Sequence, residues 1–86
     1  MPELSRFFGI VITMYARDHP PPHFHARYGE HEALVDVENS QLLRGSLSRR
    51  AQDIVDEWSA LHRAELRTAW EALRSGRAPA GIAPLE

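Results

Sequence analysis

Apolar and polar positions change their spacing near residue 47, and this change divides the chain into a strand-rich half and a helical half. Residues 9–15 are rich in β-branched and aromatic side chains, which favour a strand. The prolines Pro20-Pro21-Pro22, which follow soon after, cannot continue a hydrogen-bonded ladder. From residue 51 onward, apolar side chains recur three and four positions apart, which is the spacing of an amphipathic helix. The pattern predicts an α+β fold.

The first half, residues 1–47, predicts a four-stranded antiparallel meander. We expect its strands at residues 9–15, 23–28, 31–38 and 41–47. Gly29 and Glu30 separate the second strand from the third, and glycine in the first position of a two-residue loop favours a type II′ hairpin turn. Asn39-Ser40 is expected to form the next turn.

The helical segment is expected over residues 48–75. Ser48 can cap its first turn, and Gly76 can end it. An unbroken helix of this length would be about 40 Å long, whereas a compact chain of this size has a radius of gyration of about 12 Å. We therefore expect a break between Leu61 and Glu65, giving two helices that pack on one face of the sheet.

The last segment, residues 76–86, holds two prolines and two glycines and predicts an extended tail. Ile82 and Leu85 are the apolar side chains with which this tail can dock. Together the three segments predict a single domain over residues 1–86.

Composition limits the classes of function that the chain can serve. It has 86 residues, 43% of them hydrophobic, a formal net charge of −2 and no cysteine. One modest core is the most that this length supports, which argues against a large multi-step enzyme. The lack of cysteine removes disulfides, thiolate zinc sites and cysteine nucleophiles, and the charge argues against a strongly basic nucleic-acid-binding surface. We expect a cytoplasmic protein that does not enter the membrane, because the apolar stretch at residues 7–16 is too short to span one.

The candidate chemistry is concentrated in the run Asp18-His19-Pro20-Pro21-Pro22-His23-Phe24-His25, which contains three of the five histidines. On a strand, the two-residue period places His23 and His25 on the same face, about 6.5 Å apart, with Phe24 on the other face. The two imidazoles therefore predict a shared site.

The hairpin turn at residues 29–30 sets which side chains lie opposite this pair. With that turn, His23 pairs with Asp36 and Arg27 pairs with Glu32, all on the polar face. We expect Asp36 to lie close enough to orient the His23 ring.

This arrangement fits three kinds of function, which the residues leave open. The first is metal-free phosphodiester chemistry on RNA, with His23 and His25 as general base and acid, Asp36 orienting a ring and Arg27 stabilising developing charge.

The second is a divalent transition-metal site. His23 and His25 offer two nitrogen ligands, and Asp36, His19 or Asp18 could supply the third. The third is a non-catalytic surface on which the histidine- and proline-rich loop binds another protein. No cofactor is required by the sequence, and whether the chain is an enzyme stays open.

The same run, with Gly9 before it and Trp58, His62, Leu66, Trp70 and Pro84-Leu85 after it, resembles a family of small bacterial proteins named domain of unknown function 4160. The resemblance covers nearly the whole chain. Members are often encoded beside a second small protein, as in toxin–antitoxin pairs. The resemblance therefore implies a component of a toxin–antitoxin-like module, with a small cognate protein as partner and RNA as a candidate target. A homo-oligomer is also compatible with it. It assigns no residue roles.

Overall fold

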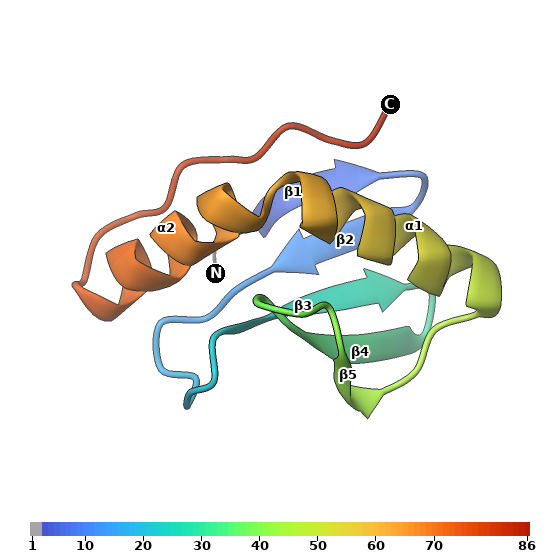
Figure 1. The fold of residues 1–86 in the computed structure, drawn as a ribbon, viewed down its shortest axis with the longest axis horizontal. Coiled ribbons are helices and arrows are strands. Elements are labelled where there is room, and N and C mark those ends of the chain that lie inside the picture. The colour runs from blue at the N-terminus through green and yellow to red at the C-terminus, as the bar shows by residue number, and fades with distance from the viewer. Residues whose placement is uncertain (1–2) are drawn as a thin grey trace.

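The computed structural model describes residues 3–86 as an antiparallel sheet of five strands followed by two helices (Figure 1). The strands lie in sequence order, so the sheet is a meander, and the α+β prediction is confirmed. The elements are β1 (Glu3–Phe7), β2 (Ile10–Thr13), β3 (His23–Tyr28), β4 (His31–Asp36), β5 (Leu42–Gly45), α1 (Arg49–Leu61) and α2 (Arg63–Arg74). The first two residues of the predicted meander segment lie outside the described residues.

The predicted number of strands was wrong, because the sheet has β1 as an additional edge strand. It pairs with β2 across the two-residue turn Phe8-Gly9, and its register shifts by one residue between Glu3 and Ser5. Such a bulge places two successive side chains, Leu4 and Ser5, in the interior. The two-residue alternation that identifies a strand is therefore absent from this segment.

The hairpin of β3 and β4 has the predicted register. His23 pairs with Asp36, and Phe24 pairs with Val35, across a turn in which Gly29 has a φ of +62°. A type II′ turn requires this positive φ at its first residue. The inward face of the hairpin is fully buried, and it consists of Phe24, Ala26, Ala33 and Val35, with Val37 directly after β4.

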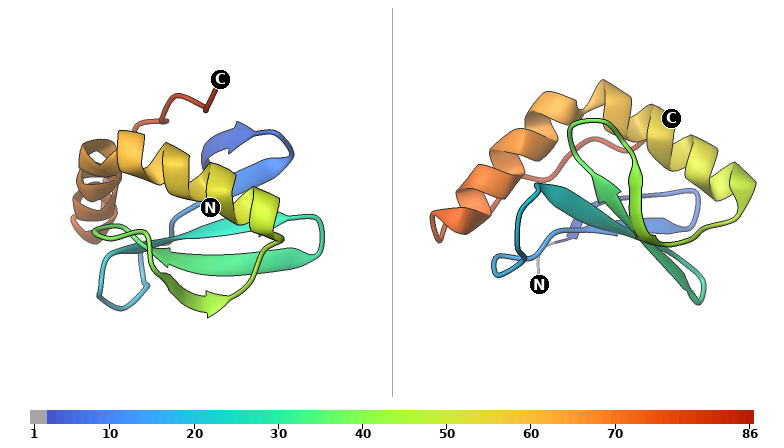
Figure 2. Two further views of the ribbon diagram at one scale, coloured as in Figure 1. Left: turned by 45° about the vertical axis from the view of Figure 1, so that its right-hand side comes forward. Right: turned by 60° about the horizontal axis from the view of Figure 1, so that its bottom comes forward.

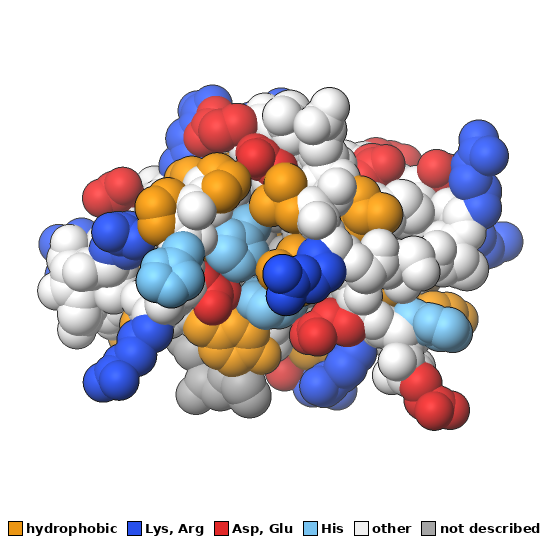
Figure 3. Space-filling view, turned by 90° about the horizontal axis from the view of Figure 1, so that it is seen from below, with side chains coloured by type: hydrophobic (Ala, Val, Ile, Leu, Met, Phe, Trp, Pro, Cys, Tyr) orange, Lys and Arg blue, Asp and Glu red, His pale blue; other side chains and the backbone are white. Residues whose placement is uncertain are grey.

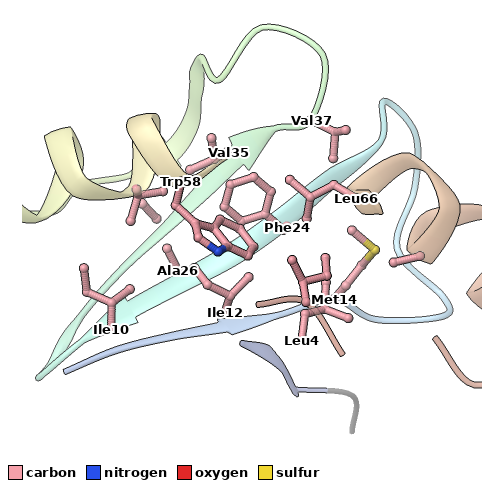
Figure 4. Close-up of a cluster of buried hydrophobic side chains, with 14 of the residues drawn as sticks. Leu4, Ile10, Ile12, Met14, Phe24, Ala26, Val35, Val37, Trp58 and Leu66 are labelled. Atoms are coloured by element: carbon pink, nitrogen blue, oxygen red, sulfur yellow. The ribbon is translucent and has the colours of Figure 1, made fainter. Parts of the chain in front are cut away.

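The core lies between this face of the sheet and the two helices (Figures 2 and 4). Trp58 of α1 is fully buried; its indole lies 5.9 Å from the Phe24 ring in an edge-to-face arrangement and 5.2 Å from the Phe7 ring. The indole N–H donates to the carbonyl oxygen of Ala83 at 2.9 Å, so the polar atom of this large side chain is satisfied. Trp58 thus joins the sheet, α1 and the tail.

The predicted break in the helical segment is confirmed at His62. This residue ends α1 with φ −116° and ψ 26°, and α2 begins at the next position. The bend lets both helices follow the sheet, and the radius of gyration is 11.6 Å. The predicted ends are confirmed as well: the Ser48 hydroxyl accepts from the Ala51 N–H, and the Gly76 N–H donates to the Leu73 carbonyl.

The tail after α2 runs back over the N-terminal edge of the sheet (Figure 1). The Ile82 N–H donates to the Leu4 carbonyl at 2.8 Å, the Ile82 side chain is buried, and Leu85 packs partly buried against the core. Both predicted apolar contacts of the tail are therefore present. None of the helices within residues 3–86 combines the length and the apolar composition that crossing a bilayer requires.

A charged pair ties the turn after β4 to α2. The Arg67 guanidinium donates to both carboxylate oxygens of Glu38 at 2.6 to 3.0 Å. This hydrogen bond, with the nearby positive charge, lowers the pKa of Glu38. Because the pKa is lower in the folded state than in the unfolded state, the pair stabilises the fold above the ordinary pKa of glutamate, and this stabilisation is lost as the pH falls.

Replacing Arg67 with Gln tests this pair. The melting temperature of Arg67→Gln should lie below that of the wild type at about pH 7, and the difference should shrink towards zero at about pH 3, where Glu38 is protonated in both proteins. Thermal melts at a series of pH values measure it. Arg77→Gln, which removes an exposed arginine outside any described ion pair, should show no such trend. A pH-independent difference for Arg67→Gln would contradict the assignment.

The end of β5 gives a sharper test of the fold. Gly45 has a φ of +76°, and a Cβ atom there would lie 2.1 Å from the Glu32 carbonyl oxygen of β4. Gly45→Ala should therefore lower the free energy of unfolding by about 2 kcal/mol or more, measured by urea denaturation. At Gly81 an added Cβ meets nothing closer than 3.8 Å, so Gly81→Ala should change it by less than about 1 kcal/mol. Equal effects of the two substitutions would show that β5 does not pair as described.

Candidate metal centre

Two imidazoles project from the same face of β3, as predicted. The ring centroids of His23 and His25 lie 5.5 Å apart, while Phe24 between them is buried in the core on the other face. The loop from β2 to β3 lies beneath α2 (Figure 1). Its Pro21 carbonyl and Asp18 carboxylate contact the rings. Figure 3 shows histidine side chains gathered around an acidic side chain, with basic side chains nearby, on the face of the molecule seen from below.

Asp18, from this loop, is the carboxylate that meets both rings. Its Oδ2 atom lies 3.1 Å from Nε2 of His23 and 2.9 Å from Nε2 of His25. The exposed fractions of the three side chains are 27% for Asp18, 9% for His23 and 14% for His25. The three polar groups therefore converge on one point that solvent reaches mainly from the side of Asp18.

The ring of His23 is held from two sides. Its Nδ1 atom lies 2.9 Å from the Pro21 carbonyl oxygen, and the indole of Trp70 in α2 packs against the ring at 5.4 Å. A carbonyl oxygen can only accept, so Nδ1 carries the hydrogen. In the neutral ring, Nε2 then presents a lone pair to Asp18.

The ring of His25 is packed against Tyr15 at 4.6 Å, edge to face. Its Nδ1 atom lies 3.5 Å from Oε2 of Glu32, in a geometry that makes no hydrogen bond, and this nitrogen is otherwise buried without a partner. A neutral His25 has one hydrogen for two nitrogens that each face a carboxylate. One nitrogen must therefore direct its lone pair at a negatively charged group.

The contacts of the two rings thus leave the cluster short of positive charge. Two carboxylates, Asp18 and Glu32, and the Pro21 carbonyl all face nitrogens of His23 and His25. Lone pairs facing anions in a mostly buried site are unfavourable. A metal ion at the point where the two Nε2 atoms and Oδ2 converge would remove the conflict.

The positions of the ligand atoms suit a metal ion. One atom from each of Asp18, His23 and His25 lies within 4.8 Å of the others. Zinc binds nitrogen and oxygen at about 2.0–2.2 Å, so ligand atoms around a tetrahedral ion lie about 3.4 Å apart. The Nε2–Oδ2 separations of 3.1 and 2.9 Å would need to open by only a few tenths of an ångström.

Three of the residues predicted for a metal site are thus together, whereas His19 lies outside this group with its side chain exposed. Asp36 lies opposite His23 in the register, but its Oδ1 atom accepts from the Glu38 N–H at 2.7 Å, and Asp18 contacts the His23 ring instead. Arg27 is exposed near the other end of β3.

The structure adds contacts to the histidine rings that the sequence did not predict, including one from Glu32, which was expected only as the partner of Arg27. Glu32 could have been found, because the register places it diagonally across from His25 on the polar face. The Pro21 carbonyl, the Tyr15 ring and the Trp70 indole depend on loop and helix packing, for which a single sequence gives no signal.

A hollow of about 530 Å³ lies at the opposite end of β3 from His23. Its lining includes Phe8, Ile10, Tyr28 and Ile54, and it holds no cluster of histidines and carboxylates. Charged side chains, among them Arg50 and Glu57, also line this hollow. Within residues 3–86, however, the histidines and the carboxylate that lie close enough together to hold a metal ion are at the start of β3.

Comparison with curated proteins and with solved structures finds no match. The sequence model of one family does match, over residues 9–71, a range that contains β2 to α1, the histidine cluster and most of α2. This family is described only as a domain of unknown function, DUF4160, and the chain belongs to it.

Proposed function

We propose that this chain is a small metal-binding domain in which Asp18, His23 and His25 hold a divalent transition-metal ion. The observation that carries the proposal is the convergence of two Nε2 atoms on one carboxylate oxygen while Nδ1 of His23 donates to the Pro21 carbonyl. A hydrogen bond from the far ring nitrogen to a carbonyl or carboxylate is the usual support of a metal-binding histidine. It fixes the tautomer that leaves Nε2 free.

Two histidines and one carboxylate are a ligand set that zinc and other first-row metals accept. Glu32, 3.5 Å from Nδ1 of His25, would support that ring as the Pro21 carbonyl supports His23. Three protein ligands leave at least one position for water or a substrate, and a metal in such a site can act as a Lewis acid. The proposed centre is therefore suited to chemistry as well as to stability.

Metal-free cleavage of RNA by His23 and His25 is the less favoured alternative. In that mechanism the scissile phosphate must lie between the two imidazoles, but Oδ2 of Asp18 lies within 3.1 Å of both Nε2 atoms. A carboxylate at this point would repel a phosphate. In that mechanism Asp36 would orient a ring and Arg27 would stabilise developing charge, so both side chains would need to reach the imidazoles. The Asp36 carboxylate instead accepts a hydrogen bond from the Glu38 N–H.

We also propose a small protein partner, as the toxin–antitoxin-like arrangement of the family implies. The outer strand β5 supports this proposal: all four of its residues are exposed, with Leu42 at 47% and Leu43 at 44%. An exposed edge strand with apolar side chains is a site where another chain can add a strand. This interaction is independent of the metal centre.

Hydrogen exchange tests the partner proposal. On addition of the small protein encoded beside this one, amides of residues 42–45 should gain protection of tenfold or more because the outer N–H groups of β5 become hydrogen-bonded. Amides of β2, which β3 and β4 separate from β5 in the sheet, serve as the internal control. Complex formation without added protection at β5, or no complex at all, would contradict the proposal.

Metal binding is tested on protein purified without a polyhistidine tag and supplemented with zinc. We expect about one zinc per chain by elemental analysis, and a rise in the free energy of unfolding of about 2.7 kcal/mol at a free zinc concentration 100 times Kd. Asp18→Asn keeps the size of the side chain but removes its charge. Because Asp18 is a direct ligand, the substitution should weaken binding by at least the roughly tenfold to hundredfold that loss of an outer-shell partner costs. Titration calorimetry measures both proteins.

The matched control is His31→Ala, since His31 is exposed and lies outside the cluster. It should bind zinc as the wild type does. His25→Ala should lose binding, and its circular dichroism spectrum shows whether the fold survives. A wild-type protein that retains no zinc after supplementation, or equal affinities for Asp18→Asn and His31→Ala, would rule out this centre.

A further inference from the structure

The loop from β2 to β3 and the end of α2 border an open hollow of about 300 Å³ beside the candidate metal centre. Its lining consists of Ala16, Arg17, Asp18, His19, Pro20 and Arg74. Asp18 belongs to both places, since it lines the hollow and also contacts the two imidazoles. The hollow therefore lies on the side from which a ligand would approach the metal.

We infer that this hollow is a subsite for a phosphoryl group, which places a phosphorylated small molecule at the metal centre. The inference rests on the proposed function and names the class of ligand for the position that the three protein ligands leave open. It accounts for His19 and for two arginines, none of which the metal centre itself uses.

The charges of the lining support an anion. Arg17 and Arg74 contribute two guanidinium groups, and among residues 3–86 neither takes part in an ion pair. The one carboxylate of the lining, Asp18, would be neutralised by the metal that it binds. With metal present, the hollow therefore has a clear excess of positive charge.

Arg74 is also held in place. Its guanidinium carbon lies 5.8 Å from the centre of the Trp70 ring, and the same indole packs against His23 at 5.4 Å. The N–H donors of a guanidinium lie in the plane of the group. Stacking this plane on an aromatic ring leaves the donors free for a two-pronged contact with phosphate oxygens. One indole thus positions both a metal-binding ring and an anion-binding arginine.

A phosphoryl group fits this hollow better than a carboxylate does. It carries up to two negative charges and three oxygens, so it can contact a guanidinium through two of them and leave the third for the metal. An acetate ion has one charge and two oxygens, so a two-pronged contact with a guanidinium leaves no further oxygen for the metal. The inference therefore predicts preference for phosphate over acetate at equal ionic strength.

Metal and phosphate should also strengthen each other. If the metal removes the negative charge of Asp18 from the hollow and offers a coordination position, phosphate binds more tightly to the loaded protein. By thermodynamic linkage the metal must then bind more tightly in the presence of phosphate by the same factor. This reciprocity distinguishes a shared site from two separate ones.

The experiment uses the full chain loaded with cobalt(II), whose visible absorption reports its ligands. Inorganic phosphate should change this absorption and should bind at least tenfold more tightly to the loaded protein than to the metal-free protein. Arg74→Gln should lower phosphate affinity by about tenfold, as expected for the loss of a charge-assisted contact, while cobalt still binds. Arg17→Gln should act in the same direction. Arg77→Gln, an exposed arginine just after α2 that does not line the hollow, is the matched control.

The outcomes separate the two proposals. Absence of cobalt binding in the wild type overturns the metal centre and the subsite together. Normal cobalt binding with equal phosphate affinity in Arg74→Gln and Arg77→Gln overturns the subsite alone. So does acetate binding as tightly as phosphate, or phosphate binding that does not depend on the metal.

Discussion

The alternation of side chains along β3 is the constraint on which the rest of the structure depends. Phe24 and Ala26 are fully buried against the helices, so the intervening residues must point to the other face of the sheet. A slip of one residue would move Phe24 out of the core and both imidazoles into it. Burial of Phe24 beneath Trp58 therefore fixes the direction of His23 and His25 as firmly as any contact within the cluster.

The features that the sequence predicted are those set by local period or turn chemistry. The hairpin register follows from Gly29 and from the alternation of apolar and polar residues on both sides of it. The helix break follows because an unbroken helix would be longer than a compact chain of this size allows. The strand β1 escaped prediction because its bulge removes the alternation. Asp36 shows a different limit: opposition across the sheet predicted a contact with His23, but its carboxylate closes a local turn with the Glu38 N–H two residues on.

Asp18 and Pro21 contact the rings from the loop between β2 and β3, a segment without regular structure. For this reason the sequence could name Asp18 as a candidate ligand but could not predict the geometry of its contacts. The loop that carries Asp18 and Pro21 is placed by the rings it covers, so its conformation depends on the folded sheet. Glu32 and Asp18 face His25 from two sides, and a neutral ring with one hydrogen cannot donate to both of them. A polar cluster of this kind is stabilised when a cation occupies its centre, and less so without one.

The bend at His62 connects the core to this cluster. A straight helix would project beyond the sheet, whereas the two helices bend over it, as Figure 2 shows. The bend lets α2 bury Leu66 in the core and, one turn later, pack Trp70 against His23. It also places Arg74, one further turn on, over the same indole at the rim of the hollow. The covering of the sheet and the shaping of the site are therefore consequences of one interruption in the helical segment, and a change that straightened the helix would affect both.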